Sequence, residues 1–254
     1  MDTYFDLGGY SFPVTTQSTE AQTWFDRGIL WTYGYNHEEA VTCFERAIDA
    51  DPKCAMAHWG AGYASGPNYN MPWDLFDDAG RAAAARAGYA HARKALDLID
   101  GATEWEAALI QALPARHPQP DPLDPEAMKA WNANFADAMR DVFAAHPESH
   151  EVRTVFAESL LNLTPWKMWD LRSGKPAASA RTVEAQTVLE EALEGDPSAM
   201  RHPGLLHLYV HLMEMSPFPE KALKAGDALR RLVPDAGHLI HMPTHIDILC
   251  GHYQ

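Results

Sequence analysis

Five histidines in the C-terminal third of the sequence have the spacing of metal ligands. His207 and His211 are four residues apart, whereas His238, His241 and His245 are separated by three and then four residues. On a helix, both spacings place side chains on one face. Neutral imidazole is a common ligand of metal ions, and two neighbouring helices with such pairs can close one site. The sequence therefore predicts that these histidines supply a metal site, with at least three of them binding one ion.

Two acidic residues are candidates to support this site. Glu214 follows His211 by three residues, so we predict that it is a further ligand or accepts an imidazole N–H, and Asp247 is its rival for the second role. Imidazoles without thiolates suit copper, zinc, nickel or iron and disfavour magnesium and calcium. Copper and zinc are favoured on intrinsic affinity, and iron fits if Glu214 joins two histidines. The alternative is a histidine-lined groove that binds an acidic or aromatic ligand directly.

Two prolines affect the helices that would carry these histidines. Pro243 falls inside the second histidine group, where a helix would lose one hydrogen bond and clash with its preceding turn. We therefore expect the helix to begin near Met242 or to kink at Pro243, and either arrangement keeps the three histidines near one centre. Pro203 is expected in the first helical turn, directly after His202.

The composition describes a globular, acidic and helical chain. It has 254 residues, 46% hydrophobic, and a formal net charge of −15, so nucleic acid and anionic membranes are improbable partners. Three cysteines without a CxxC motif argue against a disulfide framework or a cysteine-rich zinc site. The sequence shows neither a leader peptide nor an apolar run of about 18 residues, so we expect a cytoplasmic protein.

The helices that must position the histidines follow a repeated pattern, which is clearest over residues 21–54. Aromatic, small and proline residues occur there at a regular spacing: Trp24, Gly28, Trp31, Ala40, Phe44, Ala47 and Pro52. This pattern resembles the tetratricopeptide repeat family. The resemblance implies an all-α solenoid of about five stacked helical hairpins without a sheet, wound as a right-handed superhelix with a ligand-binding concave face.

Weaker repeats divide the rest of the chain, which we interpret as one helical domain over residues 1–254. Further repeats are expected to start near Ala55, His150, Met200 and Gly237, and residues 200–254 form the histidine-rich end. Residues 66–80 and 114–125 are predicted loop insertions. The last repeat is incomplete, which indicates either a fragment of a longer protein or a C-terminal end that packs against another subunit in a homo-oligomer.

The repeat register suggests which residues face the groove. The histidines of both groups fall mostly at places that line the concave face in the family. Trp59 and Tyr63 fall at equivalent places, and Asn68 follows in the insertion, so we predict that these three bind a ligand. For tryptophans at helical spacing, a position in the core is the alternative.

Two sequence blocks resemble a particular subset of the family, but this resemblance does not imply an enzymatic reaction. YNHEEAVTCFERAIDADPKCAMAHWGAGYASGPNYN and HLIHMPTHI look like a little-characterised bacterial subset of long tetratricopeptide proteins with an HxxHMPxH motif. Most members of the family bind peptides and do no chemistry, and the chain has no nucleophile motif. We therefore expect a metal-dependent protein that acts on or senses a small molecule in the groove, and a metalloenzyme if it does chemistry. The alternative is a non-enzymatic scaffold that binds a peptide or partner protein.

Overall fold

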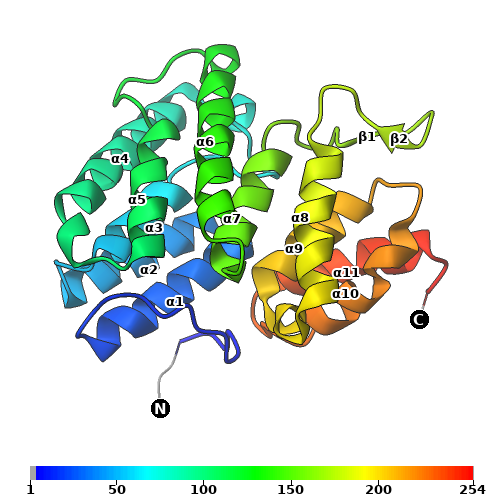
Figure 1. Cartoon of the computed structure of the whole chain (residues 1–254), viewed down its shortest axis with the longest axis horizontal. Helices are drawn as coiled ribbons and strands as arrows, with labels where there is room; N and C mark the ends of the chain where they lie inside the picture. The colour runs from blue at the N-terminus through cyan, green and yellow to red at the C-terminus, as the bar shows by residue number, and fades with distance from the viewer. Residues whose placement is uncertain (1–3, 254) are drawn as a thin grey trace.

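The computed structural model describes residues 4–253, and this part of the chain is almost entirely helical (Figure 1). It contains eleven α-helices: α1 (Thr19–Tyr33), α2 (His37–Ala50), α3 (Ala55–Ala64), α4 (Asp78–Asp97), α5 (Glu104–Ala112), α6 (Pro125–Ala145), α7 (His150–Leu161), α8 (Thr182–Gly195), α9 (Pro203–Met213), α10 (Leu223–Leu229) and α11 (Gly237–Leu249). The prediction of an all-α protein is confirmed.

Short elements complete the chain. Five 3-10 helices lie between the longer ones: η1 (Trp73–Leu75), η2 (Ile99–Gly101), η3 (Leu113–Ala115), η4 (Pro197–Arg201) and η5 (Pro219–Ala222). Two strands, β1 (Trp169–Asp170) and β2 (Lys175–Pro176), form an antiparallel ribbon between α7 and α8. The expectation of no sheet is wrong at this ribbon, where Gly174 adopts a φ of 65° that permits a tight turn.

Side chains at the helix N-termini explain where several helices begin. Ser18, Asn36 and Asp124 each accept a hydrogen bond from a backbone N–H in the first turn of the following helix. Thr103 and Glu106 form a reciprocal capping box at the start of α5. These local signals satisfy N–H groups that a helix cannot satisfy itself, so they fix the boundaries between elements.

Several helices begin at the residues where the sequence predicted that repeats start. Helices α3, α7 and α11 begin at Ala55, His150 and Gly237, where the sequence placed repeat starts. Helix α9 begins at Pro203, three residues beyond the expected start, with His202 as its N-cap. The predicted insertion 66–80 holds η1 and the start of α4, whereas 114–125 is mostly irregular and ends where α6 begins.

The first repeat packs through two glycines on either side of one aromatic ring. A Cβ atom at Gly28 would lie 2.7 Å from the Phe44 ring, and one at Gly60 would lie 2.4 Å from it. Both separations are shorter than any real carbon contact, so only glycine allows α1, α2 and α3 to approach this closely. Phe44 itself is fully buried.

The helices form a closed arrangement. Each helix packs against the next along the chain, and α1 also packs against α9. Every residue of α3 and α9 is buried, so the inner side of the array is filled by side chains. The N-terminal segment adds a further link, because the Asp235 N–H donates to the Asp6 carbonyl at 2.9 Å. The first helix thereby lies beside α9, which carries two of the histidines.

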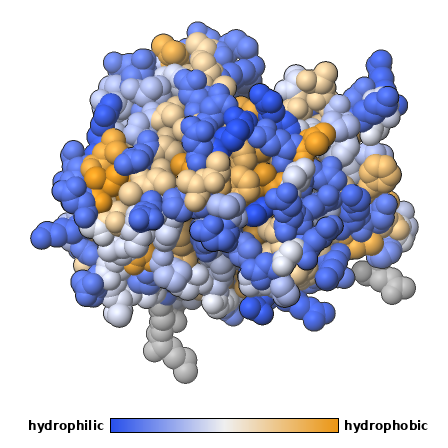
Figure 2. Space-filling model, viewed as in Figure 1, coloured by the Kyte–Doolittle hydropathy of each residue, from blue (hydrophilic) through white to orange (hydrophobic). Residues whose placement is uncertain are grey.

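The face of the molecule seen in Figure 2 is mainly hydrophilic. Figure 2 shows hydrophilic residues over much of one face, with apolar residues exposed between them. Over residues 4–253, no helix combines the length and apolar character that crossing a membrane requires.

Candidate metal centre

Helix α9 positions the first two histidines in the interior. His207 and His211 lie one turn apart, and both side chains are almost completely buried. As predicted, Pro203 occupies the first turn of this helix, directly after the His202 cap. Because α9 packs against α1, α7, α8, α10 and α11, its two imidazoles are held on all sides by neighbouring helices.

Helix α11 carries the other three histidines and runs without interruption from Gly237 to Leu249. The expected helix start near Met242 is therefore wrong, because the helix continues through Pro243 and forgoes the one hydrogen bond that proline cannot donate. His238 lies in the first turn of the helix and faces α9. Its ring centroid is 4.9 Å from that of His207 and 5.6 Å from that of His211.

Three histidines form a compact group with ligand spacing, here called the triad: His207, His211 and His238. One nitrogen of each lies within 4.8 Å of the corresponding nitrogen of the others. His207 and His211 are buried, and His238 is half-buried. Nitrogens bound to one transition-metal ion at about 2.0–2.1 Å lie about 3–4 Å apart, so small side-chain rotations would bring the three onto one ion.

Two nitrogens of the triad have no hydrogen-bond partner among residues 4–253. Nε2 of His207 and Nε2 of His211 are buried and unpartnered. A hydrogen bond elsewhere on each ring fixes its orientation. His211 Nδ1 lies 2.8 Å from Glu214 Oε1, and His207 forms a hydrogen bond with the Tyr33 backbone. A carboxylate oxygen only accepts, so the proton of neutral His211 lies on Nδ1 and its lone pair lies on Nε2.

The electrostatics keep these imidazoles neutral. Burial holds the pKa of His207 well below its usual value, and the neighbouring His211 and His238 lower it further. Burial also lowers the pKa of His211, although Glu214 opposes the shift. For His238, burial and then His211 lower the pKa to about 4. Each ring is therefore an electron-pair donor at neutral pH, which is the form that binds a metal ion.

Glu214 connects the triad to a second pair of histidines. Its Oε1 accepts from His211, and its Oε2 lies 2.5 Å from His245 Nδ1. Burial would raise the pKa of Glu214, but these two imidazoles outweigh it and lower that pKa, so the carboxylate is charged. Of its two expected roles, Glu214 occupies that of an acceptor that orients imidazoles. Its rival Asp247 instead forms an ion pair with Arg230 at 3.0 Å.

His241 and His245 lie outside the triad. Their Nε2 atoms are 2.9 Å apart, and the His245 side chain is 39% exposed. That all three histidines of α11 share one ion stays a prediction. Seven residues at 1.5 Å each place the backbone of His245 about 10 Å along the axis from that of His238.

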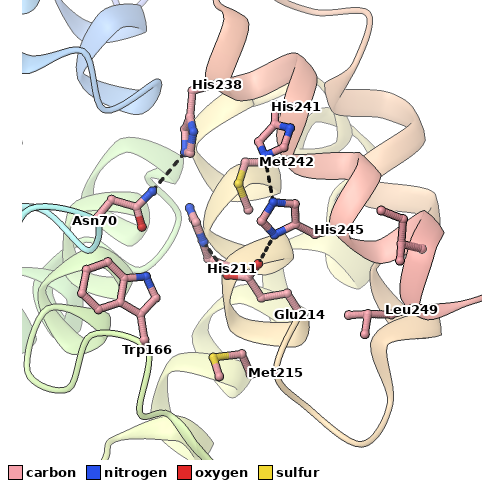
Figure 3. Close-up of a pocket in the computed structure, with 11 residues that line it drawn as sticks. Asn70, Trp166, His211, Glu214, Met215, His238, His241, Met242, His245 and Leu249 are labelled. Carbon is pink, nitrogen blue, oxygen red and sulfur yellow. Dashed lines mark hydrogen bonds and ion pairs between the residues drawn. The ribbon is translucent and has the colours of Figure 1, made fainter.

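A cavity of about 750 Å³ opens beside these groups (Figure 3). His211 and His238 line one wall, with His241, His245 and Glu214 next to them. The remaining wall is mostly apolar, with one amide, and is formed by Asn70, Trp166, Met215, Met242, Ile248 and Leu249. This size and mixture are typical of a site for a small organic molecule.

Two residues at the site have strained backbones. Among non-glycine residues 4–253, only Tyr35 and Trp166 have positive φ, each at 57°. The Tyr35 ring lies 4.6, 5.5 and 5.4 Å from the rings of His207, His211 and His238. Such conformations persist only where the surrounding structure holds them, and they concentrate at functional sites. Sequence analysis missed Tyr35, because its position depends on the contact between α1 and α9.

The three predicted ligand-binding residues do not line this cavity in the described part of the chain. Trp59 and Tyr63 are fully buried and stack on each other, and the Tyr63 hydroxyl donates to Glu158. Asn68 is also buried, and its side chain accepts the backbone N–H of Asn70 at 2.9 Å. Asn68 thus shapes the turn, while Asn70 lines the cavity.

No known family model and no curated protein matches this sequence.

Proposed function

We propose that this chain is a transition-metal protein whose triad holds one ion beside the cavity. The single observation that carries the proposal is the pair of buried, unpartnered Nε2 atoms of His207 and His211, which converge with His238. Buried polar atoms are normally hydrogen-bonded, so two lone pairs without donors require an explanation. A metal ion supplies it, since one ion accepts all three pairs at once. A single water could donate to only two of them.

The ligand chemistry favours particular metals. Three neutral imidazoles suit copper or zinc first, with iron or nickel as further possibilities, and they suit magnesium and calcium poorly. Cys43 and Cys54 are buried in the hydrophobic core, so they do not contribute thiolates. A three-imidazole set leaves at least one coordination position for an outside molecule, as in catalytic zinc sites.

The cavity supports action on a small molecule. It lies directly beside His211 and His238, so a molecule bound there would reach the ion's open side. A bound ion of this kind can polarise a substrate or activate water or dioxygen. Trp166, Met215 and Met242 would contact the apolar part of the molecule. We therefore propose a metalloenzyme that acts on a small, partly apolar substrate.

We also propose that the helices are a tetratricopeptide-like solenoid. Successive hairpin packing and the glycine contacts with Phe44 support this proposal. A peptide-binding scaffold is less well supported, because α3 and α9 are buried along their whole length and leave no open groove beside them. A bacterial source, a cytoplasmic location and a homo-oligomer through the C-terminal end stay predictions.

Metal analysis of untagged protein tests the triad. After chelation and reloading with Zn²⁺, we expect the wild-type protein to retain a tightly bound ion through gel filtration. The variants His207→Ala and His211→Ala should each lose this ion, as measured by plasma mass spectrometry. His252→Ala is the matched control, because His252 is exposed and belongs neither to the triad nor to the cavity wall. Circular dichroism should show unchanged helical content, and full retention of the ion in both triad variants would place the site elsewhere.

A further inference from the structure

His241 and His245 form an arrangement of their own on the cavity wall. They lie one turn apart on α11, and their rings meet edge to face at 4.7 Å. Figure 3 shows both imidazoles beside the cavity, with Glu214 on the inner side of His245. Their Nε2 atoms, 2.9 Å apart, point at each other.

The protons of this pair can be assigned from its partners. Glu214 Oε2 accepts a hydrogen bond from His245 Nδ1 at 2.5 Å, so neutral His245 carries its proton on Nδ1. Its Nε2 therefore presents a lone pair, towards which His241 donates. A carboxylate that holds the far nitrogen of an imidazole is the usual support of a metal-ligating histidine, and it fixes the ring's orientation. His245 has this support, and Nε2 is the nitrogen left for an ion.

We propose that His241 and His245 are a second transition-metal site, separate from the triad and open to solvent. This inference extends the proposed function, because both centres border one cavity and share Glu214, but either can fail alone. An ion at this site would replace the hydrogen bond between the two Nε2 atoms after His241 shifts its proton to Nδ1. The remaining coordination positions would be taken by water or by the molecule in the cavity.

The positions of the α11 histidines and of Glu214 favour two metal centres over one. The backbones of His238 and His245 lie about two helical turns apart, and the group whose nitrogens lie within 4.8 Å of one another contains His238 but neither His241 nor His245. Glu214 meets both sets, since one oxygen bonds His211 and the other bonds His245. The carboxylate thus carries the negative charge nearest to both ions. Asp247 is engaged by Arg230, so the exposed pair has few other anionic ligands.

The two sites should differ in affinity. The exposed pair offers two imidazoles instead of three and keeps more of its water, so we expect Zn²⁺ to bind it at least about tenfold more weakly than the triad. The acidic chain, with a net charge of −15, favours cations at both.

Zn²⁺ titration of chelated, untagged protein by isothermal calorimetry tests the second site. The wild-type protein and His252→Ala should bind two ions per chain. His241→Ala and His245→Ala should each bind one, with the tight affinity unchanged within about threefold for His241→Ala. His207→Ala should keep only the weak ion, which distinguishes failure of the triad from failure of the pair. Two ions in His241→Ala, or a wild-type protein whose single ion is lost in His207→Ala and kept in His241→Ala, would overturn the second site. A single ion that is kept in His207→Ala and lost in His241→Ala would overturn the triad instead.

A second measurement avoids variants altogether. Diethyl pyrocarbonate modifies exposed imidazoles, and mass spectrometry locates the modified residues. In wild-type protein, Zn²⁺ should protect His241 and His245 only at concentrations that fill the weak site, while His252 stays reactive. Continued modification of both histidines at saturating Zn²⁺ would contradict the proposal.

Discussion

Helix α9 has a buried histidine at its N-cap and two more along its length, and they differ in whether both ring nitrogens have hydrogen-bond partners. At the N-terminal end, His202 uses both nitrogens, because Nδ1 accepts the Leu205 N–H at 3.2 Å and Nε2 lies 2.9 Å from the Tyr10 hydroxyl. Further along, His207 and His211 each leave Nε2 without a partner. Burial lowers the pKa of all three. Burial and a low pKa therefore do not separate a structural histidine from a metal ligand. What distinguishes His207 and His211 is that their unpartnered nitrogens gather with a third imidazole, that of His238.

The largest expected effect concerns stability gained from metal. At a free Zn²⁺ concentration of about 1,000 times Kd, binding should stabilise the wild-type protein by about 4 kcal/mol. His202→Ala should keep this gain, because its imidazole makes no contact with the ion, and His211→Ala should lose most of it. Urea unfolding with and without Zn²⁺ measures the difference. An equal gain in all three proteins would remove the proposed distinction between the ends of α9.

A smaller effect is expected for metal-free protein when the structural histidine is removed. His202→Ala deletes a helix cap and leaves the half-buried Tyr10 hydroxyl with one partner fewer, so the unfolding free energy should fall by about 2–4 kcal/mol. The control His252→Ala should change it by less than about 0.5 kcal/mol. Urea midpoints at pH 7 without metal provide the test. A stable His202→Ala variant would show that the satisfied nitrogens contribute little.

The smallest effect is a change in pH dependence. Burial lowers the pKa of His202 to about 3, so between about pH 6.5 and 3 the unfolded state binds a proton that the folded state does not. Stability is therefore lost as pH falls through this window, by about 1.4 kcal/mol per pH unit for this group. His202→Gln should make the slope shallower by that amount between pH 6 and 4.5. Unfolding of metal-free protein over this range measures it, and an unchanged slope would mean that His202 is protonated in the folded state.

Much of the helical framework was predictable because its signals are local. Ala55, His150 and Gly237 start helices because prolines and capping residues end the preceding elements within a few positions. The pairing of His207 with His211 was predictable for the same reason, since four residues make about one helical turn. These features need no knowledge of how distant segments meet.

The composition of the site depends on long-range contacts that periodicity does not encode. Tyr35 and Asn70 reach the histidines from loops that precede α2 and α4, and Trp166 reaches the cavity from the loop after α7. Trp59 and Tyr63 occupy the predicted inner face, but other helices cover that face, so they are core residues. The division of the α11 histidines required knowing that the helix continues through Pro243.

The contact between α1 and α9 has a consequence for how the chain folds. In an array whose helices touch only their neighbours, one end can unfold while the other stays intact. Here Asp6 and Asp235, separated by 229 residues, are hydrogen-bonded, and Tyr35 packs on the triad. These contacts form only after a very long loop has closed, which slows folding and ties both ends into one cooperative unit. The histidines therefore acquire their final arrangement late, when the first hairpin docks against the last helices.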